Sequence, residues 1–311
     1  MVHDHYYWRD HEAFTRTQLV GVRAVLNALD AFRNEYGLIA DLPGFQFVDW
    51  AMGGEPPGAM EGLSCTINLH YLLTLDCAID LEEHLGEPHL AALYRSRRET
   101  VISALRRVFW SAQRGCFADD ADHAHFSEHC LSLSVRSGIL DEQERTSTAA
   151  QLQSADDLIV CELYYSHYLF DAYHRLGLGD AILERLADWR RSLAMGLKTT
   201  PERYPEDARS DCHAWSAHPL FHFFTSIAGI RPAAPGFASV LVSPTPGSLP
   251  HLTAKMPHPQ GYIAVDLHFS GNHCKGSIDL TAPISGRFCW QGCEQELKQG
   301  LNNVDITSTD R

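Results

Sequence analysis

Three segments of the sequence combine aromatic and charged side chains, two of them in loops between expected helices and one near the start of a helix. The segments are GFQFVDWAMGGEPPG with Asp49 and Trp50, CELYYSHY with Glu162, Tyr164 and Tyr165, and MGLKTTPERYPEDARSDCHAWSAHP with Glu202, Arg209, Asp211, His213 and Trp215. A pyranose ring suits this mixture, because its C–H face stacks on aromatic rings while its hydroxyl groups bond to charged or amide groups. The three segments therefore indicate a sugar-binding site.

Each of these residues also has a purely structural interpretation. Trp50 and Trp215 could be core aromatics, His213 could be a hydrogen-bonded structural histidine, and Glu202 could face the dipole of a helix N-terminus. Their clustering in loops at corresponding ends of helical hairpins favours the functional interpretation. Loops at one end of a hairpin array share a rim. We therefore expect Asp49, Trp50, Glu202 and His213 to converge at one end of the helical domain.

The elements that must position these loops are amphipathic helices. Hydrophobic residues recur every three to five positions along several stretches, and Gly37, Gly86 and Gly177 follow three of them as helix C-caps do. The expected helices cover 11–36, 62–85, 88–110, 127–136, 142–153, 156–176, 181–194 and 218–227.

The hydrophobic pattern changes after residue 230. The stretch RPAAPGF is rich in Pro and Gly, and the following residues alternate with a period of two. The expected strands cover 239–243, 251–256, 262–269, 275–280, 286–290 and 303–307. Helices followed by a block of strands predict two domains, a helical domain at 1–230 and an antiparallel β-sandwich at 231–311.

Composition narrows the function classes. The 311 residues are 45% hydrophobic, and 25 Lys and Arg against 39 Asp and Glu give a net charge of −14. Such acidity disfavours nucleic acid and membrane surfaces as partners. The start, MVHDHYYWRDHEAF, does not resemble a signal peptide, and no apolar stretch reaches the roughly 18 residues of a membrane span. We expect a soluble protein that is not exported.

Cysteine and histidine usage predicts neither a disulfide framework nor a metal centre. The nine cysteines form no CxxC pair, and their odd number along a long chain indicates a reducing cytoplasm. His123, His125 and His129 are close in DHAHFSEHC, but no matched Cys or His spacing accompanies them. A polar loop and a helix start explain them better, and we expect no metal and no cofactor.

Several of these passages together resemble a known family. FVDW, MGLKTTPE followed by RSDCHAWSAHP, and IAGIRPAAPGFASVLVSP are similar to bacterial α-L-rhamnosidases of glycoside hydrolase family 78, in the six-hairpin glycosidase superfamily. LTAKMPHPQGYIAVDL and WQGCEQELKQGLNNV resemble the C-terminal β-sandwich of these enzymes. The resemblance implies a mainly α fold, a partial (α/α)6 six-hairpin barrel followed by an antiparallel β-sandwich. It also implies a rhamnoside as the carbohydrate substrate.

The resemblance also implies roles for individual residues. Glu202 matches the general base of the inverting enzymes, which holds the attacking water across the anomeric carbon from the leaving group. Asp49 and Trp50 would form part of the sugar-binding wall, and His213 and Trp215 would contact the sugar. Pro201 stands where the family commonly has a bulky residue.

The resemblance leaves one catalytic group unassigned. The family's general acid comes from an earlier acidic, Arg-containing segment, so we expect this chain to be a C-terminal part that lacks the acid. Two other functions stay open: a non-catalytic carbohydrate-binding remnant, and a six-hairpin hydrolase of another sugar specificity, such as a glucosidase or trehalase-like enzyme. The sequence specifies no oligomeric state.

Overall fold

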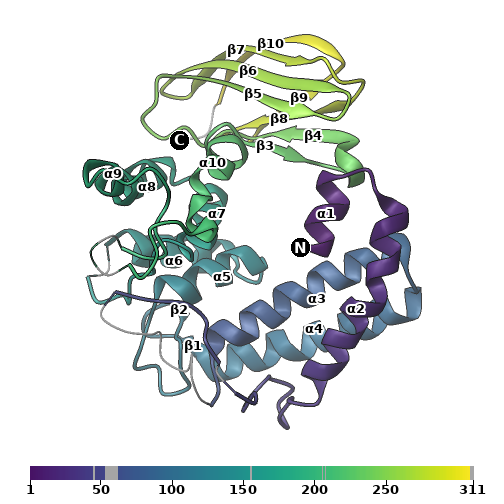
Figure 1. Ribbon diagram of the computed structural model, residues 1–311, viewed down its shortest axis with the longest axis vertical. Helices are drawn as coiled ribbons and strands as arrows, with labels where there is room; N and C mark the ends of the chain where they lie inside the picture. The colour runs from purple at the N-terminus through teal and green to yellow at the C-terminus, as the bar shows by residue number, and fades with distance from the viewer. Residues whose placement is uncertain (45, 53–61, 155, 205, 207, 309–311) are drawn as a thin grey trace. The chain divides into compact units, whose positions relative to one another are not determined.

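The computed structural model describes residues 1–44, 46–52, 62–154, 156–204, 206 and 208–308, and it divides the chain into two compact units. We call Ala13–Leu176 together with Asp188–Ser216 the helical unit. The β unit consists of Met1–Glu12, Gly177–Ala187 and Ala217–Arg311. A helix-rich first part is thus followed by sheets in the C-terminal part, as the sequence predicts (Figure 1). The predicted domain boundary at 230/231 stays a prediction.

Long helices separated by loops form the helical unit. They are α2 (Glu12–Asp30), α3 (Cys65–Leu85), α4 (Pro88–Phe109), α5 (Glu128–Ser137), α6 (Glu142–Ser154), α7 (Ser166–Leu176) and α9 (Ala187–Ala194), with the 3-10 turn η1 (Ala214–Ala217). Ser64 caps α3 by accepting a bond from the Ile67 amide, and Ser127 caps α5 by accepting one from the Cys130 amide. Most expected helices are present, although the one expected at 11–36 ends six residues early, at Asp30.

The predicted helix at 156–176 begins ten residues late, and this delay matters for the site. Residues 159 and 161 form bridges instead, Ile159 with Ser127 and Cys161 with Ala51. The Cys161 amide also donates to the Glu128 carboxylate at 2.8 Å. Because these backbone groups bond to other segments, the stretch before α7 is extended and draws the Trp50 and Glu162 segments together.

A short hairpin interrupts the helices where none was expected. Strands β1 (Trp110–Ser111) and β2 (Cys116–Phe117) pair antiparallel, so the expectation of helices and loops without strands in this part of the chain was wrong at this point. Gly115 adopts φ 65° in the turn and donates its amide to Ser111 O at 2.8 Å. Two-residue strands are too short to leave a period-two pattern, so the sequence pattern could not reveal them.

The β unit contains short helices and two four-stranded sheets. Its helices are α1 (Val2–Trp8), α8 (Gly179–Arg185), α10 (Pro219–His222), the π-helix η2 (Phe223–Ile227) and the 3-10 turn η3 (Pro235–Phe237). Its strands are β3 (Ile230–Pro232), β4 (Ser239–Val242), β5 (His251–His258), β6 (Gly261–Ser270), β7 (His273–Leu280), β8 (Ser285–Trp290), β9 (Cys293–Leu297) and β10 (Gly300–Thr307). The six predicted strands are present, while α1, β3 and β9 were not predicted.

The two sheets follow the orders β10-β7-β6-β5 and β3-β4-β8-β9. All neighbouring strands are antiparallel except β4 and β8, which are parallel, so the sheets are mainly antiparallel, as expected, with one parallel pair. Phe269 on β6 contacts Trp290 on β8 with ring centroids 4.9 Å apart, which joins the inner faces of the two sheets. Among the described residues, no helix is long and apolar enough to cross a membrane.

Candidate active site

The loop that carries Glu202 is folded back on itself by backbone bonds. The Glu202 amide donates to Ser210 O at 2.8 Å, and the His213 amide donates to Thr200 O at 2.7 Å. The Thr200 hydroxyl donates in turn to His213 O at 2.8 Å. These bonds fix Glu202 and His213 relative to each other, although the loop has no regular secondary structure there.

Glu202 is a buried carboxylate paired with an arginine. Its side chain is 3% exposed, and Arg209 Nε donates to one of its oxygens at 3.0 Å while Arg209 Nη2 donates to the other. The pKa of Glu202 is held below its ordinary value, chiefly by the hydrogen bonds from Arg209 and further by the charges of Arg209 and His213, although burial opposes this. Glu202 is therefore ionised at neutral pH.

A second buried carboxylate, Glu162, is also paired with an arginine. Its side chain is 2% exposed and accepts hydrogen bonds from Arg203 Nη2 at 2.8 Å and Nε at 3.2 Å. The backbone amide of Tyr204 donates to it as well, at 3.2 Å. The Glu162–Arg203 pair thus ties the loop around residue 203 to the segment before α7, whereas the Glu202–Arg209 pair lies within that loop.

Trp50 connects the two pairs. The guanidinium carbon of Arg203 lies 4.8 Å from the centroid of the Trp50 ring, and that of Arg209 lies 5.2 Å from it. Guanidinium groups at such distances are attracted to the electron-rich face of an indole. Trp50 therefore supports the cations that hold both carboxylates.

Asp49, beside Trp50, is buried and carries a shifted pKa. It is 1% exposed, and its Oδ2 accepts the backbone amide of Tyr165 at 3.2 Å. Burial raises the pKa of Asp49 to about 7, and the charge of Glu162 adds to the rise, while backbone hydrogen bonds and Arg203 oppose it. Near neutral pH this carboxyl group therefore exists in both protonated and ionised forms.

Trp215 contacts Glu202 through the backbone. Its Nε1 donates to the carbonyl oxygen of Glu202 at 2.8 Å. Its ring stacks on Tyr164 with centroids 5.2 Å apart and lies 4.3 Å from the ring of His213. Trp215 is thereby placed to hold Glu202 in position.

The five residues selected from the sequence meet in one cluster within the helical unit. Asp49 and Trp50 come from the segment before α3, and Glu202, His213 and Trp215 come from the loop after α9. Glu162 and Arg209 are among the residues named from the sequence in the sugar-site segments, but their ion pairs were not predicted and Arg203 was not singled out. The sequence did offer a signal for these pairs, because Arg203 follows Glu202 directly and Arg209 lies seven residues after it. Phe45 and residues 53–61 of the first segment lie outside the described residues.

The three histidines of DHAHFSEHC contact different groups and do not converge on one common position. His125 bonds to Asp120 at 2.9 Å, His123 lies 3.0 Å from Val108 O, and His129 Nε2 lies 3.2 Å from Trp50 O. Each ring thus has a different polar neighbour. The last of these contacts helps to hold the Trp50 backbone.

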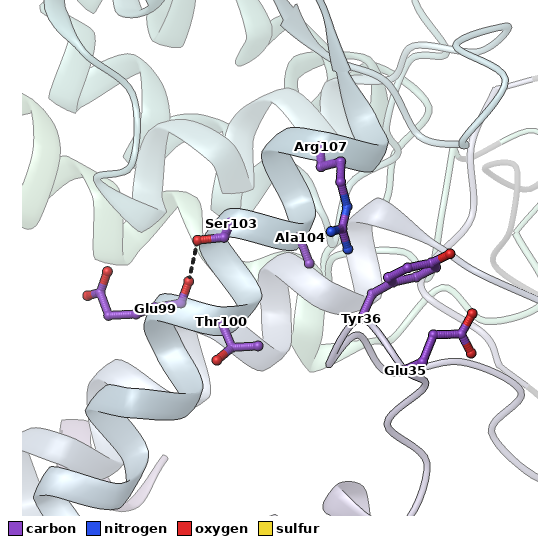
Figure 2. A pocket seen from close by; sticks show the side chains of 7 residues that line it. All are labelled: Glu35, Tyr36, Glu99, Thr100, Ser103, Ala104 and Arg107. Carbon is purple, nitrogen blue, oxygen red and sulfur yellow. Dashed lines mark hydrogen bonds between the residues drawn. The ribbon is translucent and has the colours of Figure 1, made fainter.

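A surface pocket of about 440 Å³ lies elsewhere in the helical unit (Figure 2). It is lined by Glu35, Tyr36, Glu99, Thr100, Ser103, Ala104 and Arg107, and by none of the residues of the cluster. Arg107 covers the Tyr36 ring, with its guanidinium carbon 4.5 Å from the ring centroid. Because that ring face is already occupied, Tyr36 does not offer it to a sugar.

Loss of the Arg203 guanidinium should destabilise the protein strongly. In Arg203→Met, Glu162 would remain charged and buried without its cation, which typically costs about 3–5 kcal/mol. A clear fall in the thermal unfolding midpoint, followed by circular dichroism, is expected. Arg287→Met is the control, because Arg287 and Glu294 form an exposed pair at 3.3 Å and such pairs contribute at most about 1 kcal/mol. Equal midpoints for the two variants would contradict this assignment.

Comparison with known families gives two matches that together cover most of the chain. Residues 1–227 match the family model described as bacterial alpha-L-rhamnosidase 6 hairpin glycosidase domain. Residues 229–287 match the bacterial alpha-L-rhamnosidase C-terminal domain. No curated protein sequence matches the chain.

Solved structures give the same fold. The GH78 family rhamnosidase of Bacillus sp. GL1 superposes with a TM-score of 0.79 at 22% identity, over 92% of this chain and 32% of that one. The α-L-rhamnosidase of Aspergillus terreus gives 0.82 at 16% identity, over 98% and 38%. The Streptomyces avermitilis α-L-rhamnosidase complexed with L-rhamnose gives 0.75 at 14% identity, over 97% and 32%.

These matches confirm the predicted fold class, part of a six-hairpin helical domain followed by a β C-terminal domain. The chain spans only about a third of the length of each of these solved structures.

Proposed function

Because the chain belongs to the bacterial α-L-rhamnosidase family, we propose that it forms part of an inverting glycosidase that hydrolyses terminal α-L-rhamnosides. Glu202 is the general base of this proposal. Trp50, Asp49, His213 and Trp215 form the surrounding wall of the sugar site. A neutral sugar fits the cluster, because its arginines are already paired with carboxylates.

The observation that carries the proposal is the state of Glu202. A general base in an inverting hydrolase must be an ionised carboxylate that can hold a water, with the acid about 6.5–9.5 Å away. Glu202 is buried, fixed by a folded loop, and kept ionised by Arg209. A buried carboxylate without such a cation would tend to take up a proton.

Arg209 restricts the access of water to Glu202. Its Nε and Nη2 occupy both carboxylate oxygens, which leaves little room for a water in line with a sugar. The Arg209 side chain is 70% exposed, so it can turn outward when a substrate binds. Arg209 would then serve as a positioning residue that keeps Glu202 ionised between turnovers.

We propose that the general acid comes from residues outside this sequence. The superpositions include 92–98% of this chain but only 32–38% of the compared rhamnosidases, so much of the structure of those enzymes has no counterpart in this sequence. The base side of the site would then be carried by this chain. A rhamnoside substrate is supported by the L-rhamnose complex of the Streptomyces enzyme.

A non-catalytic sugar-binding protein is the second candidate function. The closed Arg209–Glu202 pair favours it, since the guanidinium group occupies one acceptor site on each carboxylate oxygen and so competes with the attacking water. Such a protein would bind L-rhamnose but release no product even from a highly activated rhamnoside. Turnover assays therefore separate the two functions.

A reducing compartment such as the cytoplasm is part of the proposal. All nine cysteines are free in the structure, including the exposed Cys212. We also propose two domains, 1–230 and 231–311; the family matches over 1–227 and 229–287 support a change of domain near residue 228.

Removing Arg209 should change the pH dependence of hydrolysis. Because Arg209 lowers the pKa of Glu202, Arg209→Ala should raise that pKa. Activity that needs ionised Glu202 is present above its pKa and is lost as the pH falls through it. The acidic limb of the pH–rate profile on dinitrophenyl α-L-rhamnoside should therefore move to higher pH in the variant.

Arg287→Ala provides the reference for this profile, because Arg287 lies on β8 and pairs with Glu294 instead. It should leave the acidic limb unchanged. An acidic limb that stays in place in Arg209→Ala would contradict the role of Glu202 as the ionising group.

A further inference from the structure

The exposed face of the sheet β10-β7-β6-β5 carries a group of histidine and aspartate side chains. In the register of β5 and β6, His251 lies directly opposite His268. Asp266 precedes His268 by two residues, and side chains two apart on a strand point to the same face. All three side chains are exposed, so they share the outer face of this sheet.

The three side chains approach one another closely. The two imidazole rings stack with centroids 4.0 Å apart and an angle of 6° between their planes. Asp266 Oδ1 lies 2.7 Å from His251 Nε2 and 3.7 Å from His268 Nε2. One ligand atom from each residue lies within 4.8 Å of the other two.

The strands beneath hold this group on a rigid base. Leu252, Val265 and Leu267 alternate with the three residues and are buried, with Leu267 fully inaccessible. β6 is paired on both sides, with β5 and with β7. The positions of the three Cα atoms are therefore fixed, and only side-chain rotation is needed to change the spacing of the ligand atoms.

We propose that His251, Asp266 and His268 bind a divalent transition-metal cation of the Zn²⁺ class, with water completing the coordination. Two imidazole nitrogens and one carboxylate oxygen suit Zn²⁺, Ni²⁺ and Cu²⁺, whereas Ca²⁺ and Mg²⁺ prefer sets made of oxygens. Bonds of about 2.0–2.1 Å in a tetrahedron place ligand atoms about 3.4 Å apart. The distances from Asp266 Oδ1 to Nε2 of His251 and of His268, 2.7 and 3.7 Å, lie on either side of this value.

Protonation of the imidazole rings and the charge of one nearby lysine both weaken metal binding. A metal on Nε2 needs that atom deprotonated, so binding displaces the hydrogen bond between His251 and Asp266 and weakens as the pH falls. Lys275 lies opposite His268 on β7 and adds positive charge to the same face. The site belongs to the β unit and does not depend on the proposed hydrolase activity.

The same sheet face contains a natural control. His273 Nε2 lies 2.8 Å from Asp305 Oδ1, which repeats the His–Asp pair on β7 and β10. No second imidazole is grouped with this pair among the described residues. A His–Asp pair alone offers one ligand fewer, so it should bind a metal much more weakly.

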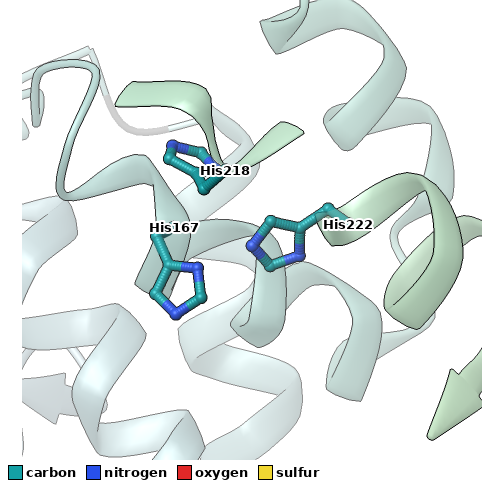
Figure 3. A group of neighbouring side chains, drawn as sticks. All are labelled: His167, His218 and His222. Carbon is teal, nitrogen blue, oxygen red and sulfur yellow. The ribbon is translucent and has the colours of Figure 1, made fainter. Parts of the chain in front are cut away.

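Another pair of histidines in the β unit carries no proposal. The rings of His218 and His222, around α10, have centroids 5.4 Å apart, and His222 Nδ1 lies 2.9 Å from the hydroxyl oxygen of Ser226 (Figure 3). His167, drawn with them, belongs to the helical unit. Two histidines from one unit do not by themselves define a metal site.

Calorimetric titration of the tag-free chain with Zn²⁺ tests the proposal, after alkylation of exposed thiols such as Cys212. His251→Ala, His268→Ala and Asp266→Asn should each lower the Zn²⁺ affinity by at least about tenfold. Substituting a residue that only hydrogen-bonds to a metal ligand already costs about that much, and these substitutions remove the ligands themselves. His273→Ala should leave the affinity unchanged. Ca²⁺ should give no saturable binding.

Because the substituted residues are exposed, the variants should keep the circular dichroism spectrum and metal-free unfolding midpoint of the wild type. The proposal would be overturned by the absence of saturable Zn²⁺ binding in the wild-type chain. Unchanged affinity in His251→Ala and His268→Ala, or an equal loss in His273→Ala, would overturn it as well.

Discussion

Replacement of Glu202 by glutamine is expected to reduce hydrolysis of an α-L-rhamnoside by at least about 10²–10⁴-fold in a form of the enzyme that also contains the general acid. Glutamine keeps the size of the side chain and can still bond to Arg209, but it cannot accept a proton from water. Steady-state rates on an aryl α-L-rhamnoside measure the loss. The loss should persist with a dinitrophenyl leaving group, because water activation is still required.

Glu206→Gln is the matched control for this substitution. Glu206 lies in the same loop, but its carboxylate is exposed and pairs with Arg191 at 2.6 Å. It should retain the wild-type rate. A larger loss in Glu206→Gln than in Glu202→Gln would move the base to Glu206 and contradict our assignment.

The second large effect concerns the leaving group. Because we propose that the general acid lies outside this sequence, the 311-residue chain alone should hydrolyse alkyl or other unactivated α-L-rhamnosides very slowly; loss of a general acid typically costs about 10²–10⁴-fold. Dinitrophenolate leaves without a proton, so the rate on its rhamnoside should suffer least. A series of rhamnosides with leaving groups of increasing acidity, assayed with the same chain, should therefore give steeply increasing rates.

A flat dependence on the leaving group, with rapid hydrolysis of an alkyl rhamnoside, would place the acid within this chain. Asp49 would be the first residue to substitute, because burial raises its pKa to about 7 and it can therefore carry a proton near neutral pH. Glu162 would follow, as a buried carboxylate beside the same tryptophan. Asp207, another carboxylate of the loop, lies outside the described residues.

The fold was predictable wherever a hydrophobic period extended over several turns or residues. Helices such as α3 and α4 and strands such as β6 fall close to their expected limits. The pattern failed where long-range backbone pairing decides the conformation. Residues 156–165 have helical periodicity, yet Ile159 and Cys161 bond to distant segments, and no local pattern can reveal those partners.

The candidate site was predictable as a set of residue types but not as a network. Aromatic and acidic residues in loops identified Trp50 and Glu202. The sequence could not reveal that Arg203 and Arg209 share the Trp50 ring, because this depends on how two loops over 150 positions apart approach each other. The Zn²⁺ site proposed on the sheet escaped prediction for a similar reason, since the opposition of His251 and His268 depends on strand register.

The measurement that tests the central claim most directly is the hydrolysis of dinitrophenyl α-L-rhamnoside by this chain and its Glu202→Gln variant. We expect turnover by the wild-type chain, with the β anomer of rhamnose as the first product in proton NMR spectra. Turnover by Glu202→Gln should not exceed the uncatalysed rate, while Glu206→Gln should match the wild type. Equal rates for the wild type and Glu202→Gln, or no turnover by the wild-type chain, would contradict the assignment of a rhamnosidase base to Glu202.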